Sequence, residues 1–392
     1  MQAVQSPLIN RGKLFKQTGP LLLSRSPSPA ILLITKQLES VPTGGREMLC
    51  KLNYDALYDI FGDRLQVLEL SKQPVTSIKS TIRAFRGHIN GLSDERIAWV
   101  LEKLQQRKID QVFVDGSNLG ELARCIKTSF PEIRICTFFH NVEARFFMGA
   151  LRQLRTARAL GVLIANYLAE RKSVRFSDKI ICLNERDSKQ LHRLYGRAAT
   201  NVSSMALEDK LPHGNAVPEN VQQEGYALFV GGGFYANRAG IVWFVTNVAP
   251  CIQVKTCIVG RGMEDLRSEY ELAGKVEFVG PVDNLAPWYR NAHFVIAPIF
   301  DGSGMKTKIA EALMFGKKIL ATPEAFVGYE DVADRAGLVC LTADDFVAAI
   351  RRAQELPLQS FDPELRAIYE EKYSFAAARE RMQRNLSEDS LP

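Results

Sequence analysis

The stretch "HFVIAPIFDGSGMKTKIAEALMFGKKILAT", residues 293–322, contains a complete strand–loop–helix–strand pattern. The apolar run at 293–298 predicts a buried strand, and Met305, Ile309 and Leu313 then follow at the spacing of one helix face. A second apolar run at 317–322 predicts the next strand. Because buried strands joined by helices are typical of a parallel sheet covered on both faces, this unit predicts an α/β fold.

The same alternation runs along most of the chain. Helical periodicity occurs at 45–60, 94–107 and 118–129, and strand-like apolar runs occur at 31–34, 66–70, 111–114, 134–139, 178–183, 226–230, 255–259, 275–280, 293–298, 317–322 and 337–341. The polar stretch 201–225, with two prolines, separates the two groups of strands. We therefore expect a flexible extension at 1–29, a Rossmann-like domain at 30–208, a linker at 209–225, a second Rossmann-like domain at 226–360 and terminal helices at 361–392. Two such domains facing each other would share one cleft.

The composition and the absence of several motifs limit the classes of protein to which this chain can belong. The chain has 392 residues, 46% of them hydrophobic, and a net charge of +6, which favours anionic ligands without choosing among them. Its seven cysteines include no C-x-x-C pair, which favours reduced thiols in the cytoplasm over a disulfide or zinc framework. The sequence contains no D-x-D pair, no P-loop and no G-x-S-x-G motif. We expect no metal, no cofactor and no nucleic-acid partner.

The loop 301–306 and the helix after it have the residues of an anion site. Glycines 302 and 304 allow close backbone approach, the helix is expected to start near Met305, and Lys306 and Lys308 add positive charge. Glu311 lies about 10 Å farther along the helix axis, within reach of a ribose whose diphosphate sits at the helix start. We expect Glu311 to be half-exposed. The alternative is a surface helix with an ordinary Lys–Glu pair.

Two further glycine turns follow strands of the second domain. "YALFVGGGFYANRAGIVWFV" (226–245) superficially resembles a dinucleotide-binding turn, but no acidic residue ends the next strand. Asn237 is expected to cap the helix there, and Arg238 is a candidate phosphate ligand. In "IVGRGMEDL" (258–266), Arg261 is expected at the edge of the cleft.

The first domain contributes two candidate regions to the cleft. Gly44 and Gly45 lie between the first strand and first helix, with Arg46 beside them. His140 directly follows the strand at 134–139, so its side chain is expected to point into the cleft. The alternative for His140 is a solvated side chain at a helix start capped by Asn141 and Glu143.

These motifs together resemble the family-4 retaining glycosyltransferases of the GT-B fold (glycosyl transferases group 1), over residues 30–385. The resemblance rests on "GGRE", "FFHNVEARFF", "ERKSVRFSDKIICLNERD", "FVGGGFYANRAGIVWFV", "CIVGRG" and the stretch 275–322 with the "AFVGYE" after it. It implies catalytic roles for His140, Lys308 and Glu311, the last on the ribose. It implies donor binding by Gly44, Gly45, Gly232, Arg238, Arg261, Ser303, Gly304, Met305, Lys306, Thr307 and Glu311. Ser303 stands where many members carry a glutamate near the donor sugar, which puts the sugar-side contacts in doubt.

The implied reaction moves a sugar from a nucleotide-diphosphate sugar to an acceptor hydroxyl with retention, without metal and by front-side displacement. The implied acceptor is a glycan or lipid-linked saccharide of bacterial polysaccharide biosynthesis. Two alternatives remain: a GT-B-like sugar-nucleotide epimerase, and a catalytically silent nucleotide-sugar-binding protein.

Residues 145–175 interleave basic and apolar side chains at helical spacing. Interfacial helices combine these features, so we expect a cytoplasmic protein that docks peripherally on an anionic membrane surface at the inner face of the plasma membrane. The alternative is that Leu160–Leu168 forms the core face of a long helix packed on the sheet.

Overall fold

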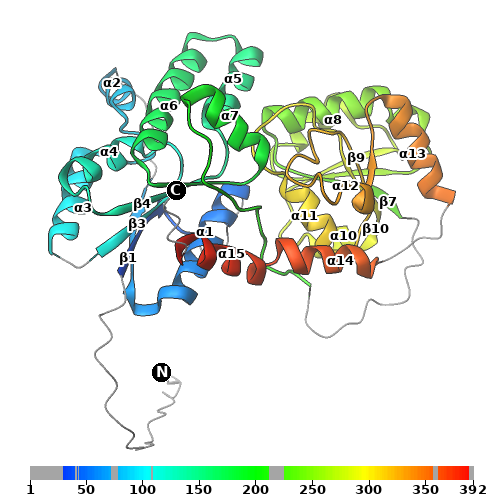
Figure 1. Cartoon of the computed structure of the whole chain (residues 1–392). Coiled ribbons are helices and arrows are strands. Elements are labelled where there is room, and N and C mark those ends of the chain that lie inside the picture. Colours follow the sequence, from blue (N-terminus) through cyan, green and yellow to red (C-terminus); the bar gives the residue numbers. More distant parts are fainter. Residues whose placement is uncertain are drawn as a thin grey trace, which may run out of the picture.

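The computed structural model describes residues 30–39, 42, 44–71, 78–106, 109–211, 225–355 and 361–387. It consists of two lobes side by side, each built on a six-stranded sheet (Figure 1). The expected extension at 1–29 lies outside the described residues, as does the part of the expected linker at 212–224.

The first lobe has a wholly parallel sheet in the order β2-β1-β3-β4-β5-β6. Its strands are β1 (Ala30–Lys36), β2 (Leu65–Leu70), β3 (Ile109–Asp115), β4 (Arg134–Phe139), β5 (Lys179–Cys182) and β6 (Asn201–Val202). The four consecutive apolar residues 31–34 are completely buried, because helices cover both faces of the sheet.

The second lobe has a parallel sheet in the order β12-β11-β10-β7-β8-β9. Its strands are β7 (Tyr226–Val230), β8 (Thr256–Val259), β9 (Val276–Gly280), β10 (Ala292–Ala297), β11 (Ile319–Ala321) and β12 (Gly337–Val339). The α/β expectation with two parallel sheets is confirmed.

Helices surround both sheets. The first lobe has α1 (Gly45–Phe61), α2 (Ile78–Arg86), α3 (Asp94–Gln106), α4 (Gly120–Ser129), α5 (Glu143–Leu154), α6 (Ala157–Phe176) and α7 (Glu185–Tyr195). The second has α8 (Tyr235–Asn247), α9 (Arg267–Tyr270), α10 (Ala286–Asn291), α11 (Thr307–Met314), α12 (Ala333–Ala336) and α13 (Ala343–Glu355). Short 3₁₀ turns occupy Gly62–Arg64, Ala249–Cys251 and Glu264–Leu266.

The last helices return from the second lobe to the first. α14 (Pro363–Ile368) packs on α11, a π-helical turn spans Tyr369–Tyr373, and α15 (Phe375–Ser387) packs on α1 (Figure 1). The amide of Leu207 donates to the carbonyl of Tyr373 at 2.9 Å, so this segment also holds the end of the first lobe. The C-terminal segment therefore ties the two lobes together.

Each sheet has a switch point, where the strand order changes from running one way across the sheet to running the other. In the first sheet the switch point lies between β1 and β3, and in the second between β7 and β10. Ligands of open α/β sheets bind beyond the carboxyl ends of strands at such points. The loops that carry Gly44, Gly232 and Gly304 follow β1, β7 and β10, so all three lie at switch points.

One strand is absent from the sequence-based prediction. Asn201–Val202, inside the expected first domain, form β6, which pairs with β5. Two residues are too short for periodicity to reveal a strand.

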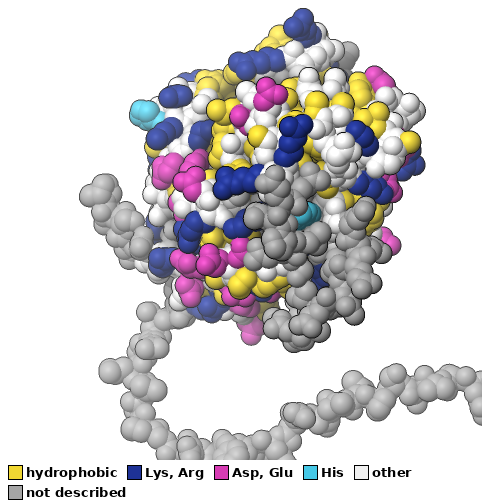
Figure 2. Space-filling view, turned by 90° about the vertical axis from the view of Figure 1, so that its right-hand side faces the viewer, with side chains coloured by type: hydrophobic (Ala, Val, Ile, Leu, Met, Phe, Trp, Pro, Cys, Tyr) yellow, Lys and Arg dark blue, Asp and Glu magenta, His cyan; other side chains and the backbone are white. Residues whose placement is uncertain are grey.

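Surface charge is mixed on the face of the second lobe that Figure 2 shows. Basic and acidic side chains are interspersed there with apolar ones, among the described residues in view. A broad basic patch of the kind that binds nucleic acid is therefore not present on the described part of this face. Among the described helices, none has both the length and the apolar content needed to cross a membrane.

Candidate functional site

The loop after β10 delivers two lysines to the start of α11. Gly302 and Gly304 have φ of 140° and 65°, which favour glycine, and they turn the chain tightly between strand and helix. The helix begins at Thr307 with Lys306 as its N-cap, two residues later than the expected start near Met305. The left-handed backbone of Gly304 and the extended backbone of Lys306 explain the later start.

Lys306, Lys308 and Glu311 are all buried, so this is not an ordinary surface helix. Lys306 Nζ lies 3.2 Å from the Gly304 carbonyl oxygen and 3.1 Å from Glu324 Oε1. Lys308 Nζ donates to Asn237 Oδ1 at 3.0 Å and lies 4.6 Å from the centre of the Phe229 ring. Burial, followed by repulsion from Lys306, lowers the pKa of Lys308 to about 7.

Glu311 was expected to be half-exposed, and this is wrong, because only 4% of its surface is accessible. Its Oε2 accepts a hydrogen bond from the Tyr289 hydroxyl at 2.8 Å, and Lys210 Nζ lies 3.5 Å from Oε1. Tyr289 is itself completely buried and stacks on Phe315. The carboxylate is thus held by the protein in one orientation, at the place where the ribose of a donor is expected.

A side chain of α8 holds the glycine turn after β7 by a hydrogen bond. Asn237 was expected to cap this helix, but the helix begins at Tyr235 with Phe234 as its N-cap. Asn237 is instead buried inside α8, where its Nδ2 donates to the Gly232 carbonyl at 2.8 Å while its Oδ1 accepts from Lys308. One amide therefore fixes both the turn and the lysine.

The two arginines expected on this side lie apart from α11. Arg238 NH1 donates to the Gly262 carbonyl at 2.8 Å and lies 3.3 Å from Asp265. Arg261 is exposed on the neighbouring turn. Met305 is a core residue whose sulfur lies 3.4 Å from the Met205 amide, so only its backbone is available for a ligand.

The glycine loop of the first lobe touches the start of α11. Gly44 is the N-cap of α1 and Gly45 is its first residue. A Cβ atom added at Gly45 would lie 3.1 Å from Thr307 Cγ2, which leaves no room for a larger side chain. The loops after β1 and β10 thus meet across the two lobes.

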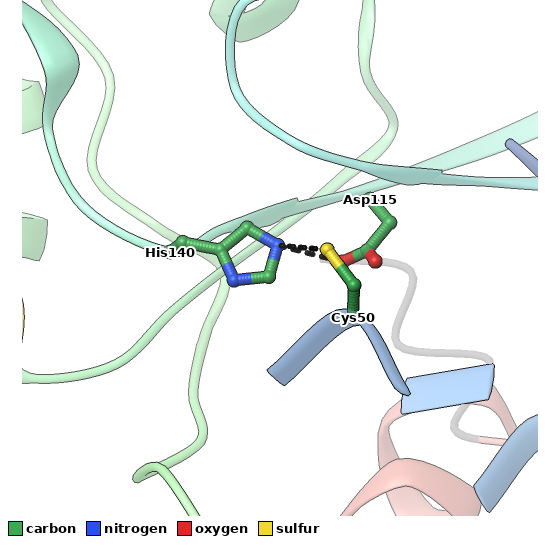
Figure 3. Close-up of side chains that lie close together, drawn as sticks. All are labelled: Cys50, Asp115 and His140. Atoms are coloured by element: carbon green, nitrogen blue, oxygen red, sulfur yellow. Dashed lines mark hydrogen bonds and ion pairs between the residues drawn. The ribbon is translucent and has the colours of Figure 1, made fainter. Parts of the chain in front are cut away.

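We call the contact between the loops of the two lobes at the start of α11 the seam. His140 also lies on the seam and is buried, with 8% of its surface exposed. The expected alternative, a solvated histidine, is therefore wrong. Its Nε2 lies 2.8 Å from Asp115 Oδ1 and 3.8 Å from Cys50 Sγ, as Figure 3 shows. Its Nδ1 is buried and has no hydrogen-bond partner among the described residues. A proton shared with Asp115 at Nε2 leaves the Nδ1 lone pair of a neutral imidazole available to a ligand.

Asp115 is held by three neighbours, on β1, on α1 and directly after β4. Thr35 Oγ1 and Asn53 Nδ2 donate to its two oxygens at 2.8 and 2.9 Å, in addition to the contact with His140. Burial acts to raise the pKa of Asp115, but His140 and these hydrogen bonds outweigh it and hold the pKa below its usual value. Burial and the adjacent Asp115 raise the pKa of the Cys50 thiol well above its usual range, so Cys50 is a neutral neighbour.

The sequence suggested no metal cluster, yet Cys50, Asp115 and His140 bring three ligand-type atoms within 4.8 Å of one another. The members come from α1, β3 and the end of β4, so no local spacing could reveal them. The 2.8 Å separation of Nε2 and Oδ1 is that of a direct hydrogen bond. Burial and the adjacent Asp115 also favour the protonated form of the Cys50 thiol when no metal ion is bound. These features fit a hydrogen-bond network that orients His140.

A cavity of about 150 Å³ opens beside this network. It is lined by Lys36, Arg46, Glu47, Leu70, Asn90, Asp115 and Leu119, at the carboxyl ends of β1, β2 and β3. Mixed charged and polar walls suit a hydroxyl-rich ligand. This cavity belongs to the first lobe and lies next to His140 through Asp115.

The seam itself is hydrogen-bonded. Ser303 Oγ accepts from the Val142 amide at 3.1 Å and lies 3.4 Å from the Val142 carbonyl oxygen. A Cβ atom added at Gly304 would lie 2.8 Å from the His140 carbonyl oxygen. The seam therefore brings together Gly45, His140, Ser303, Gly304 and Thr307. Lys306, Lys308 and Glu311 are buried next to it, at the start of α11 and along that helix.

Sequence analysis missed Asp115, Asn237 in its observed role, and Glu324. Asp115 could have been predicted, because it is an acidic residue at the carboxyl end of a buried strand, and the other site loops follow the same ends of the strands. Glu324 had none, since its partners are far away in the sequence.

The chain is similar to one known protein family and to several solved structures. Residues 224–355 match the family model "Glycosyl transferases group 1". No curated protein matches the chain. Among solved structures, Anabaena HepE in complex with UDP superposes with a TM-score of 0.65 and 15% identity, over 91% of this chain and 99% of that chain. The sucrose-phosphate synthase of Thermosynechococcus elongatus gives a TM-score of 0.67 and 16% identity, over 91% and 98%.

A third similar structure is the lipopolysaccharide outer core galactosyltransferase WaaB in its apo form, with a TM-score of 0.60 and 12% identity over 91% of this chain and 99% of that chain. At these identities the superpositions establish the fold. Residues 224–355 are therefore similar to the Glycosyl transferases group 1 family, and the chain as a whole has the two-lobed α/β fold of these solved structures, which is called GT-B.

Proposed function

We propose that this protein is a retaining glycosyltransferase that moves a hexosyl group from a nucleotide-diphosphate sugar to an acceptor hydroxyl without a metal ion. The observation that carries the proposal is the seam, where Gly45 and His140 of the first lobe contact Thr307 and Gly304 at the start of α11. A donor bound there touches both lobes. The group 1 glycosyltransferase match of the second lobe supports the same reaction class.

The donor side supplies charge and orientation. The start of α11 offers free backbone N–H groups and the positive end of the helix dipole, with Lys306 as the adjacent cation. These groups stabilise the negative charge that develops on a departing diphosphate. Glu311 is oriented by Tyr289 to accept from ribose hydroxyls. HepE is solved with UDP and with UDP-glucose, so uridine nucleotides are the first donors to test.

The acceptor side supplies a positioned imidazole. The Asp115 contact directs His140 Nε2 inward, and the unpartnered Nδ1 is free to accept from a sugar hydroxyl. The cavity lined by Asp115, Arg46 and Lys36 is the place we assign to the acceptor. We assign no nucleophile to the protein. The bond between the anomeric carbon and the diphosphate oxygen breaks, the acceptor oxygen bonds to that carbon on the same face, and the departing diphosphate oxygen takes the acceptor proton.

The test has two stages. Thermal shift with UDP, GDP and ADP identifies the nucleotide, since one-site binding at a hundredfold excess over the dissociation constant adds about 2.7 kcal/mol. The matching donor is then incubated with glycan acceptors, and the anomeric configuration of the product is read by NMR. Inversion would refute retention. Interconversion of the donor without acceptor would indicate an epimerase, and binding without turnover would indicate a silent binding protein.

We further propose that a lipid-linked acceptor is reached through a membrane-facing surface, which we name the α2–α6 face. The expected helix at 145–175 is in fact two helices, α5 and α6, broken at Arg155 with φ of 48°. Arg145 faces the second lobe rather than a membrane, since its Nε donates to the Gly302 carbonyl at 3.2 Å. We therefore leave Arg145 out and base the proposed surface on α6 and α2, which lie in contact with each other.

The α2–α6 face combines exposed apolar and exposed basic side chains. They are Ile82, Phe85, Leu160 and Ile164, with Lys79, Arg83, Arg86, Arg171 and Arg175. Phe85 packs near Gly161, which places the two helices side by side. On α6, positions 160, 164, 171 and 175 fall on one helix face. Each exposed cation near an anionic leaflet contributes about 1 kcal/mol, so this set is enough for reversible binding.

Liposome flotation tests this surface. Binding is expected to require anionic lipid, to fall with salt, and to be lost in Arg83→Glu/Arg171→Glu. The double variant Arg352→Glu/Arg384→Glu makes the same charge change at exposed positions on α13 and α15, and it should float like the wild type. Equal flotation with neutral lipid, or equal loss in both double variants, would contradict the assignment.

A further inference from the structure

Glu324 lies in the loop after β11, and its carboxylate is surrounded by cations from both lobes. Lys306 Nζ of the second lobe is 3.1 Å from Oε1. Arg186 NH1 and Arg145 NH2 of the first lobe are 2.6 and 3.7 Å from Oε2. Burial acts to raise the pKa of Glu324, but Lys306 and Arg186 outweigh it, so the pKa is lowered and the carboxylate is ionised.

The three cations have more donors than the carboxylate satisfies. Arg186 Nε and NH2 are buried, and no group among the described residues accepts a hydrogen bond from them. The nearest other carboxylate oxygen, on Asp187, is 3.7 Å from Arg186 Nε. Buried guanidinium N–H groups without acceptors are costly, so this cluster is suited to an anion with more oxygens than one carboxylate.

The position of the cluster indicates which anion. Lys306 is the N-cap of α11, and Arg145 also donates to the carbonyl of Gly302 in the loop before it. Arg186 stands in the first turn of α7, which faces the same loop from the first lobe. This is the end of α11 to which the proposed function assigns the donor diphosphate, and the inference rests on that function.

We propose that Arg145 and Arg186 form, with Lys306, a two-lobe site for the donor diphosphate, and that the Glu324 carboxylate occupies this site until the diphosphate displaces it. A diphosphate offers several oxygens and at least two negative charges, which match three cations better than one carboxylate does. Glu324 thereby competes with the donor. Its ion pairs across the seam also hold the lobes together when no diphosphate is bound.

Titration of the whole protein with UDP, inorganic pyrophosphate and uridine tests the site. Glu324→Gln removes the competing charge, so UDP and pyrophosphate should bind about two- to tenfold more tightly, the effect of one lost hydrogen-bonded competitor. Arg186→Gln should weaken both by about tenfold or more, since it removes a charge-assisted contact. Uridine lacks phosphate, so its affinity should stay the same in both variants. Glu371→Gln, an exposed carboxylate of the C-terminal segment, is the matched control.

The outcomes separate this inference from the proposed function. If the wild type binds UDP but Glu324→Gln binds it no more tightly, Glu324 does not occupy the diphosphate site. If Arg186→Gln, folded by its melting curve, keeps wild-type affinity for pyrophosphate, the first-lobe arginines are not ligands. If the wild type binds no nucleotide at all, the donor site itself is wrong and this inference falls with it. Weaker uridine binding in either variant would indicate a general loss of structure instead of an anion site.

Discussion

Replacing Glu311 by glutamine is the sharpest perturbation of the donor site. Glutamine keeps the shape of the side chain, and its amide oxygen can still accept from the Tyr289 hydroxyl that now donates to Oε2 at 2.8 Å. The variant therefore removes the negative charge that a ribose would meet, together with the 3.5 Å ion pair to Lys210. Alanine would be a poorer choice, because it leaves the completely buried Tyr289 hydroxyl without an acceptor.

The two substitutions should differ in a predictable way. An unsatisfied buried hydroxyl costs about 1–3 kcal/mol, so Glu311→Ala should lower the melting temperature by several degrees. This exceeds the roughly 0.5 kcal/mol expected for a surface glutamate. Glu311→Gln should melt close to the wild type. Losing one charged hydrogen bond to ribose, about 1.5–3 kcal/mol, should weaken UDP binding about 10- to 150-fold.

Calorimetric titration with UDP, with melting curves of the same samples, measures both effects. Glu380→Gln, at an exposed position on α15, controls for the charge change. UDP affinity in Glu311→Gln equal to that of the control would refute the assignment of Glu311 to the ribose. A large loss of melting temperature in Glu311→Gln would instead mean that the carboxylate is mainly structural.

Three further predictions concern metal, the seam and pH. Activity should survive EDTA in the wild type and in Cys50→Ser, and a loss restored by Mg²⁺ or Zn²⁺ would reveal a metal site. Gly304→Ala should lower turnover far more than Gly274→Ala, because both have positive φ (65° and 74°) but only a Cβ at Gly304 meets another residue, the His140 carbonyl at 2.8 Å; equal losses would exclude a role for the seam. Burial raises the pKa of Glu170 to about 7 from 4.5, so the folded state holds a proton that the unfolded chain releases, and stability should fall as pH rises from about 5 to 7. Glu170→Gln should lack this decline in a pH series of urea unfolding, and parallel curves would contradict it.

The fold was predictable because its information is local. Each expected strand was an apolar run of the kind that a doubly covered parallel sheet requires, and each appears in the structure. The glycines at 45 and 304 were found for the same reason, since a tight turn at a strand end leaves a mark in the sequence itself. β6 was not predicted, because two residues are too few to show the periodicity of a strand.

The electrostatics of the site were not predictable, because they depend on contacts between distant residues. Glu311 was expected to be half-exposed from its place on a helix with polar neighbours. In the structure, α14 and the π-helical turn after it cover α11, and the carboxylate is buried. The network around Asp115 joins residues from β1, α1 and the end of β4. Glu324 likewise acquires its first-lobe partners, Arg145 and Arg186, only when the two lobes meet.

Burial of these charges also has a functional consequence. Lys308 is oriented by Asn237 and Glu311 by Tyr289, so the protein holds these two charged groups in place by its own contacts. The cost of removing them from water is met during folding, where the large apolar core that extends through both lobes offsets it. A diphosphate leaving the sugar then meets cations and backbone N–H groups that need not reorganise, which is the condition under which electrostatic stabilisation accelerates a reaction. Oriented cations also strengthen the binding of a nucleotide, because less conformational freedom is lost when the ligand binds. Turnover of a donor with an acceptor is therefore the measurement that separates a transferase from a passive binder.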